Sequence, residues 1–169
     1  PQIVVWRDGI FESLGEEAAS ASAASSDQQE VFYRVEIGGE TVGEIGQGLM
    51  ILLGVSGEDT EEEMRFLAKK IVNLRIFTDE NDKMNLSLMD IGGEALVVSQ
   101  FTLYADTSSR RPGFPGAARP DLAVPLYERF MEQCRRRGFQ VEHGAFGADM
   151  AVQSVNDGPV TIWMDTETL

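Results

Sequence analysis

The sequence predicts a mixed α/β fold, in which mostly antiparallel strands form barrel-like packed sheets with two helices against them. Several short stretches alternate apolar and polar residues with the period of two that is typical of strands, and two longer stretches carry apolar residues at helical spacing. Neither a repeat nor a linker divides the 169 residues. We therefore expect a single domain over residues 1–169.

The strands are expected from alternation and from runs of β-forming residues. In residues 31–37 every second side chain is large and apolar, and the Gly38-Gly39 pair predicts a hairpin whose return strand is ETVGEI. Residues 49–55 are apolar throughout, which is typical of a strand buried on both faces. Residues 95–103 are dense in β-formers and predict another strand. The remaining strands are expected at IVVWR, FQVEH, DMAVQSV and VTIWM.

The first helix begins at a cap formed by Asp59 or Thr60, and its first turn, residues 61–63, places three glutamates at the positive end of the helix dipole. The second begins at Asp121 and ends at Gly138. Residues 13–30 are a low-complexity mixture of Ala, Ser and Glu with one large apolar residue. That composition buries too little surface to offset its ordering entropy, so we expect a flexible insert.

The net charge of −14 disfavours binding of nucleic acid over the whole surface, because a polyanion is recognised by clustered Lys and Arg. The segment 107–139 is different, since it holds seven arginines against three acidic residues. Arginine recognises phosphate through a planar, bidentate fork. The alternative for each of these arginines is a solvated position on a charged helix face.

Most catalytic and metal-binding arrangements are excluded by composition. The chain has one cysteine, Cys134, and one histidine, His143, too few for an internal disulfide or a Cys/His zinc site. A Ser-His-Asp site would have to use His143, and no GxSxG turn accompanies it. No apolar run reaches the length of a membrane span, and no secretory signal pattern is found. We expect a cytoplasmic protein with no cofactor, no metal and no membrane partner.

Two short polar patches interrupt apolar strands. One is Ser99-Gln100 together with Thr102, and the other is NDGPVT at 156–161. Polar groups at the end of a buried strand need hydrogen-bonding partners or a ligand, because burying them unpaired costs free energy. The simplest interpretation of NDGPVT alone is a turn, since Asn, Asp, Gly and Pro are the commonest turn residues.

Six segments in register nevertheless resemble the D-aminoacyl-tRNA deacylase (D-tyrosyl-tRNA deacylase) family. They are GETVGEIGQGL, LRIFTDENDKMNLSL, SQFTLYAD, RRPGFPGA, GAFGADMAV and NDGPVT. The resemblance runs from about Gly39 to Trp163. The chain departs from the family at its N-terminus, where the first strand ends WRDG and the insert follows, although Arg7 matches the family's arginine.

The resemblance implies a deacylase fold and a homodimer that hydrolyses the ester joining a D-amino acid, or glycine, to the 3′-terminal adenosine of tRNA, a proofreading step in translation. In the family, the Gly-Pro pair has a cis peptide bond and enters the pocket of the other subunit. Its carbonyls there accept hydrogen bonds from the substrate ammonium, and its main chain collides with an L side chain. Rejection by main chain needs no recognition of the side chain itself.

The same resemblance implies the site residues. Those near the ester are Ser99, Gln100, Phe101 and Thr102; those that bind substrate are Gly158, Pro159, Asn156, Thr161, Phe146, Met150 and Arg7. Phe146 would stack on the terminal adenine, or else be a core aromatic. Arg110 and Arg111 follow SQFTLYAD and are placed to reach tRNA phosphates.

Three alternatives stay open. Thr102 has the chemistry of a nucleophile, but no base to activate it is evident, so we favour assistance by the ribose 2′-OH. The related branch that removes L-alanine has a trans Gly-Pro bond and lacks the Ser-Gln motif, which this chain retains. The third alternative is a catalytically idle nucleic-acid-binding or scaffold protein that uses the arginine segment.

Overall fold

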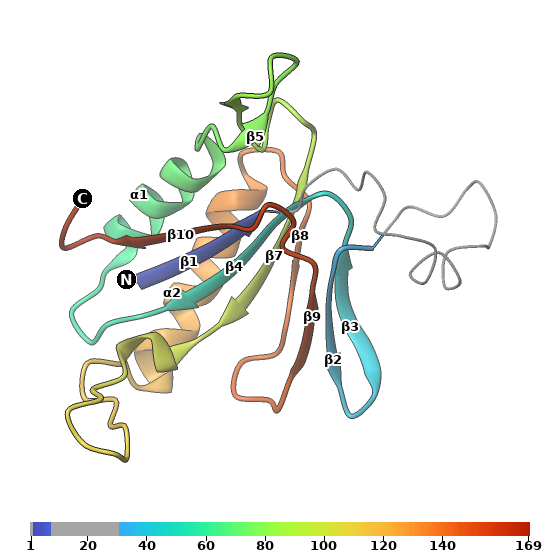
Figure 1. Ribbon diagram of the computed structural model, residues 1–169. Helices are drawn as coiled ribbons and strands as arrows, with labels where there is room; N and C mark the ends of the chain where they lie inside the picture. The colour runs from blue at the N-terminus through green and yellow to red at the C-terminus, as the bar shows by residue number, and fades with distance from the viewer. Residues whose placement is uncertain (1, 8–30) are drawn as a thin grey trace.

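The computed structural model describes residues 2–7 and 31–169. In these residues a five-stranded sheet lies between two helices on one face and a three-stranded sheet on the other (Figure 1). The predicted mixed α/β fold with two helices and mostly antiparallel strands is confirmed. The predicted insert at 13–30 lies outside the described residues.

The large sheet has the strand order β10-β1-β4-β7-β8. Its strands are β10 (Val160–Asp165), β1 (Gln2–Arg7), β4 (Gly48–Gly54), β7 (Glu94–Ser99) and β8 (Val141–His143). β1 pairs antiparallel with both β10 and β4, whereas β4–β7 and β7–β8 are parallel. β4 and β7 are apolar along nearly their whole length because both of their faces are covered.

The small sheet has the order β3-β2-β9 and is antiparallel throughout. Its strands are β3 (Glu40–Ile45), β2 (Tyr33–Ile37) and β9 (Ala151–Ser154), and the predicted Gly38-Gly39 hairpin joins β2 to β3 with both glycines at positive φ. A separate two-stranded hairpin is formed by β5 (Phe77–Thr78) and β6 (Met84–Leu86).

The helices are α1 (Glu61–Val72) and α2 (Pro120–Arg135), which pack against each other. Of the two predicted caps for α1, Thr60 is the one used. Its side chain accepts from the Glu62 N–H at 3.2 Å, and its own N–H donates to Glu63 at 2.8 Å, which forms a capping box. The Thr60 hydroxyl also donates to the Glu63 carboxylate, and this hydrogen bond, together with that from the Thr60 N–H, lowers the pKa of Glu63.

Two cores follow from alternation along β4 and β7. Leu49, Ile51 and Leu53 point into the larger core beneath α1 and α2. Met50 and Leu96 point the other way and form the smaller core with the three-stranded sheet, which contributes Tyr33 and Val35. The central strands therefore hold both layers in place.

The stretch 95–103 was predicted to be one strand, and this is wrong beyond Ser99. β7 ends there, and Phe101–Tyr104 forms a short 3₁₀ helix, η2. The main chain explains the change: the Gln100 N–H still pairs with the Leu53 carbonyl at 2.8 Å, but the Leu103 N–H turns back to the Gln100 carbonyl at 3.3 Å. Phe101 and Thr102 thus leave the sheet at its edge.

The register that positions Ser99 is fixed where β4 and β7 begin. Gly48 pairs with Glu94 there, and Ser99 pairs with Leu53 at the other end of the same ladder. A Cβ atom on Gly48 would lie 1.8 Å from the Glu94 carbonyl oxygen, so no larger residue fits. The close approach at this glycine sets the level at which β7 ends.

Candidate active site

A cavity of about 310 Å³ opens at the end of β7. Ser99, Gln100 and Phe101 line one side of it, and Phe146 and Met150 line another, so five of the predicted site residues come together. The rest of the lining is mostly apolar and comes from β4, α2 and β9. A cavity of this size is at the lower end of those that bind small-molecule ligands.

Thr102 lies next to the cavity but does not line it. Its hydroxyl accepts a hydrogen bond from the Gln100 side-chain amide. The N–H groups of Phe101 and Thr102 are at the open end of η2, where no side chain caps the helix, and in the described part of the chain neither donates to a protein acceptor. Two main-chain donors are therefore free beside the cavity.

Phe146 and Met150 are held by the loop that follows β8. Phe146 packs edge-on against Tyr127 of α2, with ring centroids 6.2 Å apart. Met150 lies over Gly144, where a Cβ atom would come within 2.4 Å of the Met150 sulfur. Phe146 is therefore a partly exposed aromatic on a cavity wall, which agrees with the binding role better than with the alternative of a core aromatic.

One buried carbonyl joins the walls of this cavity. The Val97 carbonyl of β7 accepts from the Tyr127 hydroxyl at 2.8 Å and from the Gly144 N–H at 3.2 Å. Burial raises the pKa of the Tyr127 phenol, so this hydroxyl stays protonated and donates throughout the neutral range. β7, α2 and the loop that carries Phe146 thus meet at one oxygen atom.

The NDGPVT segment lies far from the cavity of its own chain. Across the large sheet, Val160 pairs with Arg7, Arg7 pairs with Leu49, and Leu49 pairs with Ala95. The end of the NDGPVT segment is therefore level with the beginning of β7. Ser99 is level with Leu53, four residues further along, which is about 13 Å at the rise of a strand. Figure 1 shows the link between β9 and β10 at the opposite end of the sheet from η2.

Within that segment the side chain of Asn156 holds the turn. Its Oδ1 accepts from the Val160 N–H at 3.0 Å, and its Nδ2 donates to the Thr161 hydroxyl at 3.1 Å. Gly158 has φ +130°, a conformation that L side chains rarely adopt, and both Gly158 and Pro159 are exposed. The turn interpretation of NDGPVT therefore holds for the single chain.

The expectation of a cis Gly158–Pro159 bond is wrong for this structure, in which the described residues contain no cis peptide bond. The physical reason is that the trans form of an X–Pro bond is intrinsically favoured by about 0.5–1 kcal/mol. Among the described residues, the hydrogen bonds of this turn come from Asn156, and none that would reverse this preference is made by Gly158 or Pro159.

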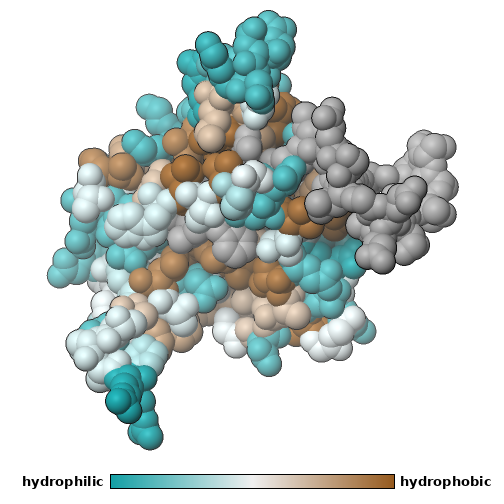
Figure 2. All heavy atoms as spheres, in the orientation of Figure 1, coloured by the Kyte–Doolittle hydropathy of each residue, from teal (hydrophilic) through white to brown (hydrophobic). Residues whose placement is uncertain are grey.

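The predicted arginines differ in what surrounds them. Arg7 is at the end of β1, next to Val160 in the sheet. Arg110 and Arg111 are exposed in the loop between η2 and α2, and no described carboxylate is within ion-pair distance of either. Figure 2 shows this loop as a hydrophilic protrusion at the lower left.

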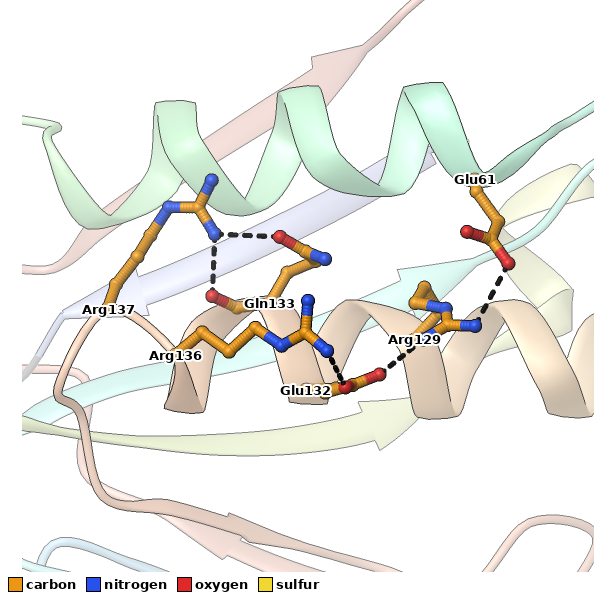
Figure 3. A network of polar contacts seen from close by, with 6 residues as sticks. All are labelled: Glu61, Arg129, Glu132, Gln133, Arg136 and Arg137. Atoms are coloured by element: carbon orange, nitrogen blue, oxygen red, sulfur yellow. Dashed lines mark hydrogen bonds and ion pairs between the residues drawn. The ribbon is translucent and has the colours of Figure 1, made fainter.

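The arginines of α2 are occupied instead by contacts within the chain (Figure 3). Arg129 pairs with Glu61 of α1 at 3.1 Å and with Glu132, which also pairs with Arg136. Arg137 donates to the Gln133 carbonyl at 2.6 Å. The interpretation of these arginines as a charged helix face is confirmed, and Arg110 and Arg111 remain the members of the segment that are free to bind an external anion.

The described cavity lining contains no acidic or basic side chain. His143 is outside it and contacts the Gly144 carbonyl through Nδ1 at 2.7 Å. Cys134 is buried in α2, and burial raises the pKa of its thiol to about 12. In residues 2–7 and 31–169, no group of three or more His, Cys, Asp or Glu side chains could hold a metal ion, and no helix is long and apolar enough to cross a membrane.

Sequence reasoning missed two aromatic residues at the site. Tyr127 was hidden within the apolar stripe of α2, and only its position beside β7 reveals its hydrogen bond. Phe114 packs edge-to-face against Phe101, with ring centroids 4.9 Å apart. The one available signal for Phe114 was its place in RRPGFPGA, a motif of the resemblance with no role attached.

Comparison with known proteins gives one consistent result. Residues 29–165 match the family model described as D-Tyr-tRNA(Tyr) deacylase. A D-aminoacyl-tRNA deacylase of Bacillus licheniformis is 58% identical over 134 residues, which cover 79% of this chain and 91% of the relative. A Bacillus subtilis relative, 57% identical over 129 residues that cover 76% of this chain and 98% of the relative, is described as an inactive D-aminoacyl-tRNA deacylase.

Among solved structures, one described as c-Myc DNA Unwinding Element Binding Protein has a TM-score of 0.80 and 36% identity, and the match covers 98% of this chain and 99% of that one. The relatives' descriptions thus include an enzyme, an inactive protein and a DNA-binding protein.

The contribution of the Tyr127 hydroxyl, which donates to the Val97 carbonyl, can be tested by mutation. Replacing Tyr127 by Phe keeps the ring against Phe146 but removes the donor, while the Gly144 N–H still satisfies the carbonyl. We expect the free energy of unfolding to fall by about 0.5–1.5 kcal/mol, measured by urea denaturation at fixed protein concentration. Tyr127→Leu, which also removes the ring, should cost more. Equal losses for the two variants would contradict a separate contribution from the hydroxyl.

Proposed function

The chain belongs to the D-Tyr-tRNA(Tyr) deacylase family, and we propose that it hydrolyses the ester of D-aminoacyl-tRNA and of glycyl-tRNA, as a proofreading enzyme of the cytoplasm. The observation that supports this best is the cavity itself. It brings Ser99, Gln100 and Phe101 together with Phe146 and Met150, and two free main-chain N–H groups lie at its edge.

Ester hydrolysis needs donors for the oxyanion and a means of activating water. The N–H groups of Phe101 and Thr102 are suited to the first task, since no acceptor among residues 2–7 and 31–169 competes for them. The neutral lining supplies no base. We propose that the ribose 2′-OH, the hydroxyl next to the ester, positions or activates the water, and that Thr102, already bonded to Gln100, orients the Gln100 amide.

The terminal adenosine would lie against the wall formed by Phe146. A partly exposed ring that is braced from behind by Tyr127 offers a stacking surface for a base. Met150 beside it would fill the space around the ligand, as a flexible side chain does well.

A homodimer would complete the pocket. The NDGPVT segment is about 13 Å along the sheet from its own cavity, so a partner subunit is the plausible source of the Gly158-Pro159 contact. The small sheet packs beside β7 and β8, whereas the edge strand β10 on the opposite side of the large sheet carries Trp163, which is 54% exposed. Covering such an aromatic is a usual role of a subunit interface.

Rejection of L-amino acids would come from the main chain at Gly158 and Pro159, which offers no side chain to adapt to the substrate. Asn156 and Thr161 hold this turn, and Arg7 is its neighbour in the sheet. The trans bond favours a second candidate function by the resemblance, removal of L-alanine from tRNA. The retained Ser99-Gln100 pair favours the D-specific function.

The substrate class is tested by single-turnover hydrolysis of D-tyrosyl-, L-tyrosyl-, glycyl- and L-alanyl-tRNA. The D-tyrosyl and glycyl esters should be cleaved at least about 100-fold faster than the L-tyrosyl ester, which corresponds to roughly 3 kcal/mol of discrimination. Faster cleavage of L-alanyl-tRNA than of D-tyrosyl-tRNA would establish the second candidate. Binding of all four without turnover would establish the idle nucleic-acid-binding alternative.

The role of Thr102 is tested by Thr102→Ala. If the 2′-OH assists the reaction, the variant should keep kcat within about 10-fold of the unmodified protein, which is the scale of one lost hydrogen bond. Substrate that ends in 2′-deoxyadenosine should instead be cleaved more than about 100-fold more slowly. A trapped acyl-Thr102, or a loss of several orders of magnitude in Thr102→Ala with unchanged tRNA binding, would restore the nucleophile.

Completion of the pocket by the partner is tested with a purified heterodimer. One subunit carries Gly158→Val with Pro159→Val, which alters the turn, and the other carries Ala148→Phe, which fills the cavity from a half-buried position on its wall. Both homodimers should be inactive. The heterodimer should recover about half the wild-type rate, because one of its two pockets then combines an intact cavity with an intact turn. An inactive heterodimer would mean that each chain completes its own pocket.

The phosphate-binding role of Arg110 and Arg111 is tested by changing both to Glu. The expected result is a higher KM for charged tRNA with a flatter salt dependence, because two phosphate contacts are lost. The matched control is Arg65→Glu with Lys69→Glu, which makes the same charge change at exposed positions of α1. An equal rise in KM for both pairs would show that only net charge matters.

A further inference from the structure

The rim of the cavity carries an aromatic pair, in which Phe101 is exposed and Phe114 is half-buried, and to which the proposed function gives no task. The Phe101 and Phe114 rings meet at 77° with centroids 4.9 Å apart, and Phe101 is 55% exposed. An aromatic pair with one exposed ring leaves apolar surface in water that a flat ligand would cover favourably. Phe101 also lines the cavity, so this surface is continuous with the predicted place of the terminal adenosine.

The loop that carries Phe114 is fixed at several points. The Asp106 N–H donates to the Gly113 carbonyl at 2.8 Å, and the Gly113 N–H donates back at 3.0 Å. Its far end is tied to Val55, the residue that follows β4, by the Ala118 N–H, which donates to the Val55 carbonyl at 2.8 Å. Phe114 is therefore presented by a closed loop beside η2, not by a free segment.

The tip of the same loop is the cationic part of the rim. Arg110 and Arg111 lie between the two paired residues Asp106 and Gly113, and no described carboxylate pairs with them. In α2, by contrast, Arg129 and Arg136 are bound to Glu132 (Figure 3). Aromatic surface beside unpaired arginine is the combination that binds single-stranded nucleic acid, since bases stack on the rings while arginines contact the backbone.

The size of the cavity decides which nucleotide this surface would meet. A volume of about 310 Å³ suits one small ligand, so a second nucleotide has to lie outside, on the rim. We propose that Phe114, together with the exposed part of Phe101 and with Arg110 and Arg111, forms a subsite for the nucleotide that precedes the terminal adenosine of tRNA. This subsite rests on the proposed function, because it assumes that the adenosine occupies the cavity.

The test compares two short substrates, D-tyrosyl-adenosine and the D-tyrosyl ester of the dinucleotide cytidylyl-adenosine. In the unmodified protein the added nucleotide should raise kcat/KM by roughly 5- to 100-fold, the range expected for one stacked base. In Phe114→Ala the ratio of the two kcat/KM values should fall to about one. In Phe114→Leu, which keeps an apolar contact with Phe101, the ratio should also fall to about one. In Phe114→Trp the ratio should stay as in the unmodified protein.

Three results would overturn the subsite. A ratio of about one in the unmodified protein would mean that the second nucleotide is not bound. An equal loss on both substrates in Phe114→Ala would mean that Phe114 only supports Phe101. A monomeric Phe114→Ala protein, shown by light scattering, would assign the aromatic pair to the contact between two copies of the chain.

Binding of the uncharged ligands separates this subsite from the proposed function. Calorimetry should give a tighter Kd for cytidylyl-adenosine than for adenosine, and Phe114→Ala should remove the difference. That result in a protein without turnover would support the subsite and contradict the deacylase function. Turnover of D-tyrosyl-tRNA together with equal affinity for adenosine and cytidylyl-adenosine would support the deacylase function and contradict the subsite.

Discussion

The hydrogen bonds to the Val97 carbonyl are the interaction on which the site depends. One buried oxygen accepts from Tyr127 of α2 and from Gly144, where the loop with Phe146 and Met150 begins. Two residues further along the same strand is Ser99. The elements that form the cavity come from distant parts of the sequence, and each is positioned relative to this carbonyl. A buried acceptor shared in this way fixes geometry because a donor that moved away from it would leave its own buried polar group without this partner.

The parallel pairing of β4 with β7 explains where the pocket lies relative to the Gly-Pro turn. Gly48 allows the two main chains to approach at Glu94, and the register that follows puts Leu53 beside Ser99. The antiparallel pairs through β1 then place Val160 at the far end of the ladder. In a rigid sheet these distances do not adjust. The chain thus separates its cavity from its Gly-Pro turn, and the proposed homodimer is an arrangement that would bring the two together.

Much of this organisation could be predicted from the sequence, and the failures have local causes. Alternation and the Gly38-Gly39 pair predicted the β2–β3 hairpin, and a cap at Asp59 or Thr60 followed by three glutamates predicted the start of α1. The strand assigned to 95–103 failed after Ser99 because Phe101 and Thr102 have high strand propensity, whereas the main chain turns at Gln100. The role of Tyr127 could not be predicted, since a buried tyrosine in a helical stripe resembles any core residue until its neighbour is known.

The arginines of residues 107–139 differ in their neighbours, which a count of charges does not show. All seven are equivalent in such a count, but the fold gives Arg129, Arg136 and Arg137 partners within the chain and leaves Arg110 and Arg111 exposed on a closed loop. In a chain of net charge −14, long-range attraction for a polyanion is weak. Recognition then depends on contacts made within a Debye length, where two unpaired guanidinium groups beside an aromatic surface count for more than the average charge. The acidic surface elsewhere acts in the same direction, because it disfavours every orientation of a nucleic acid except the one that reaches this loop.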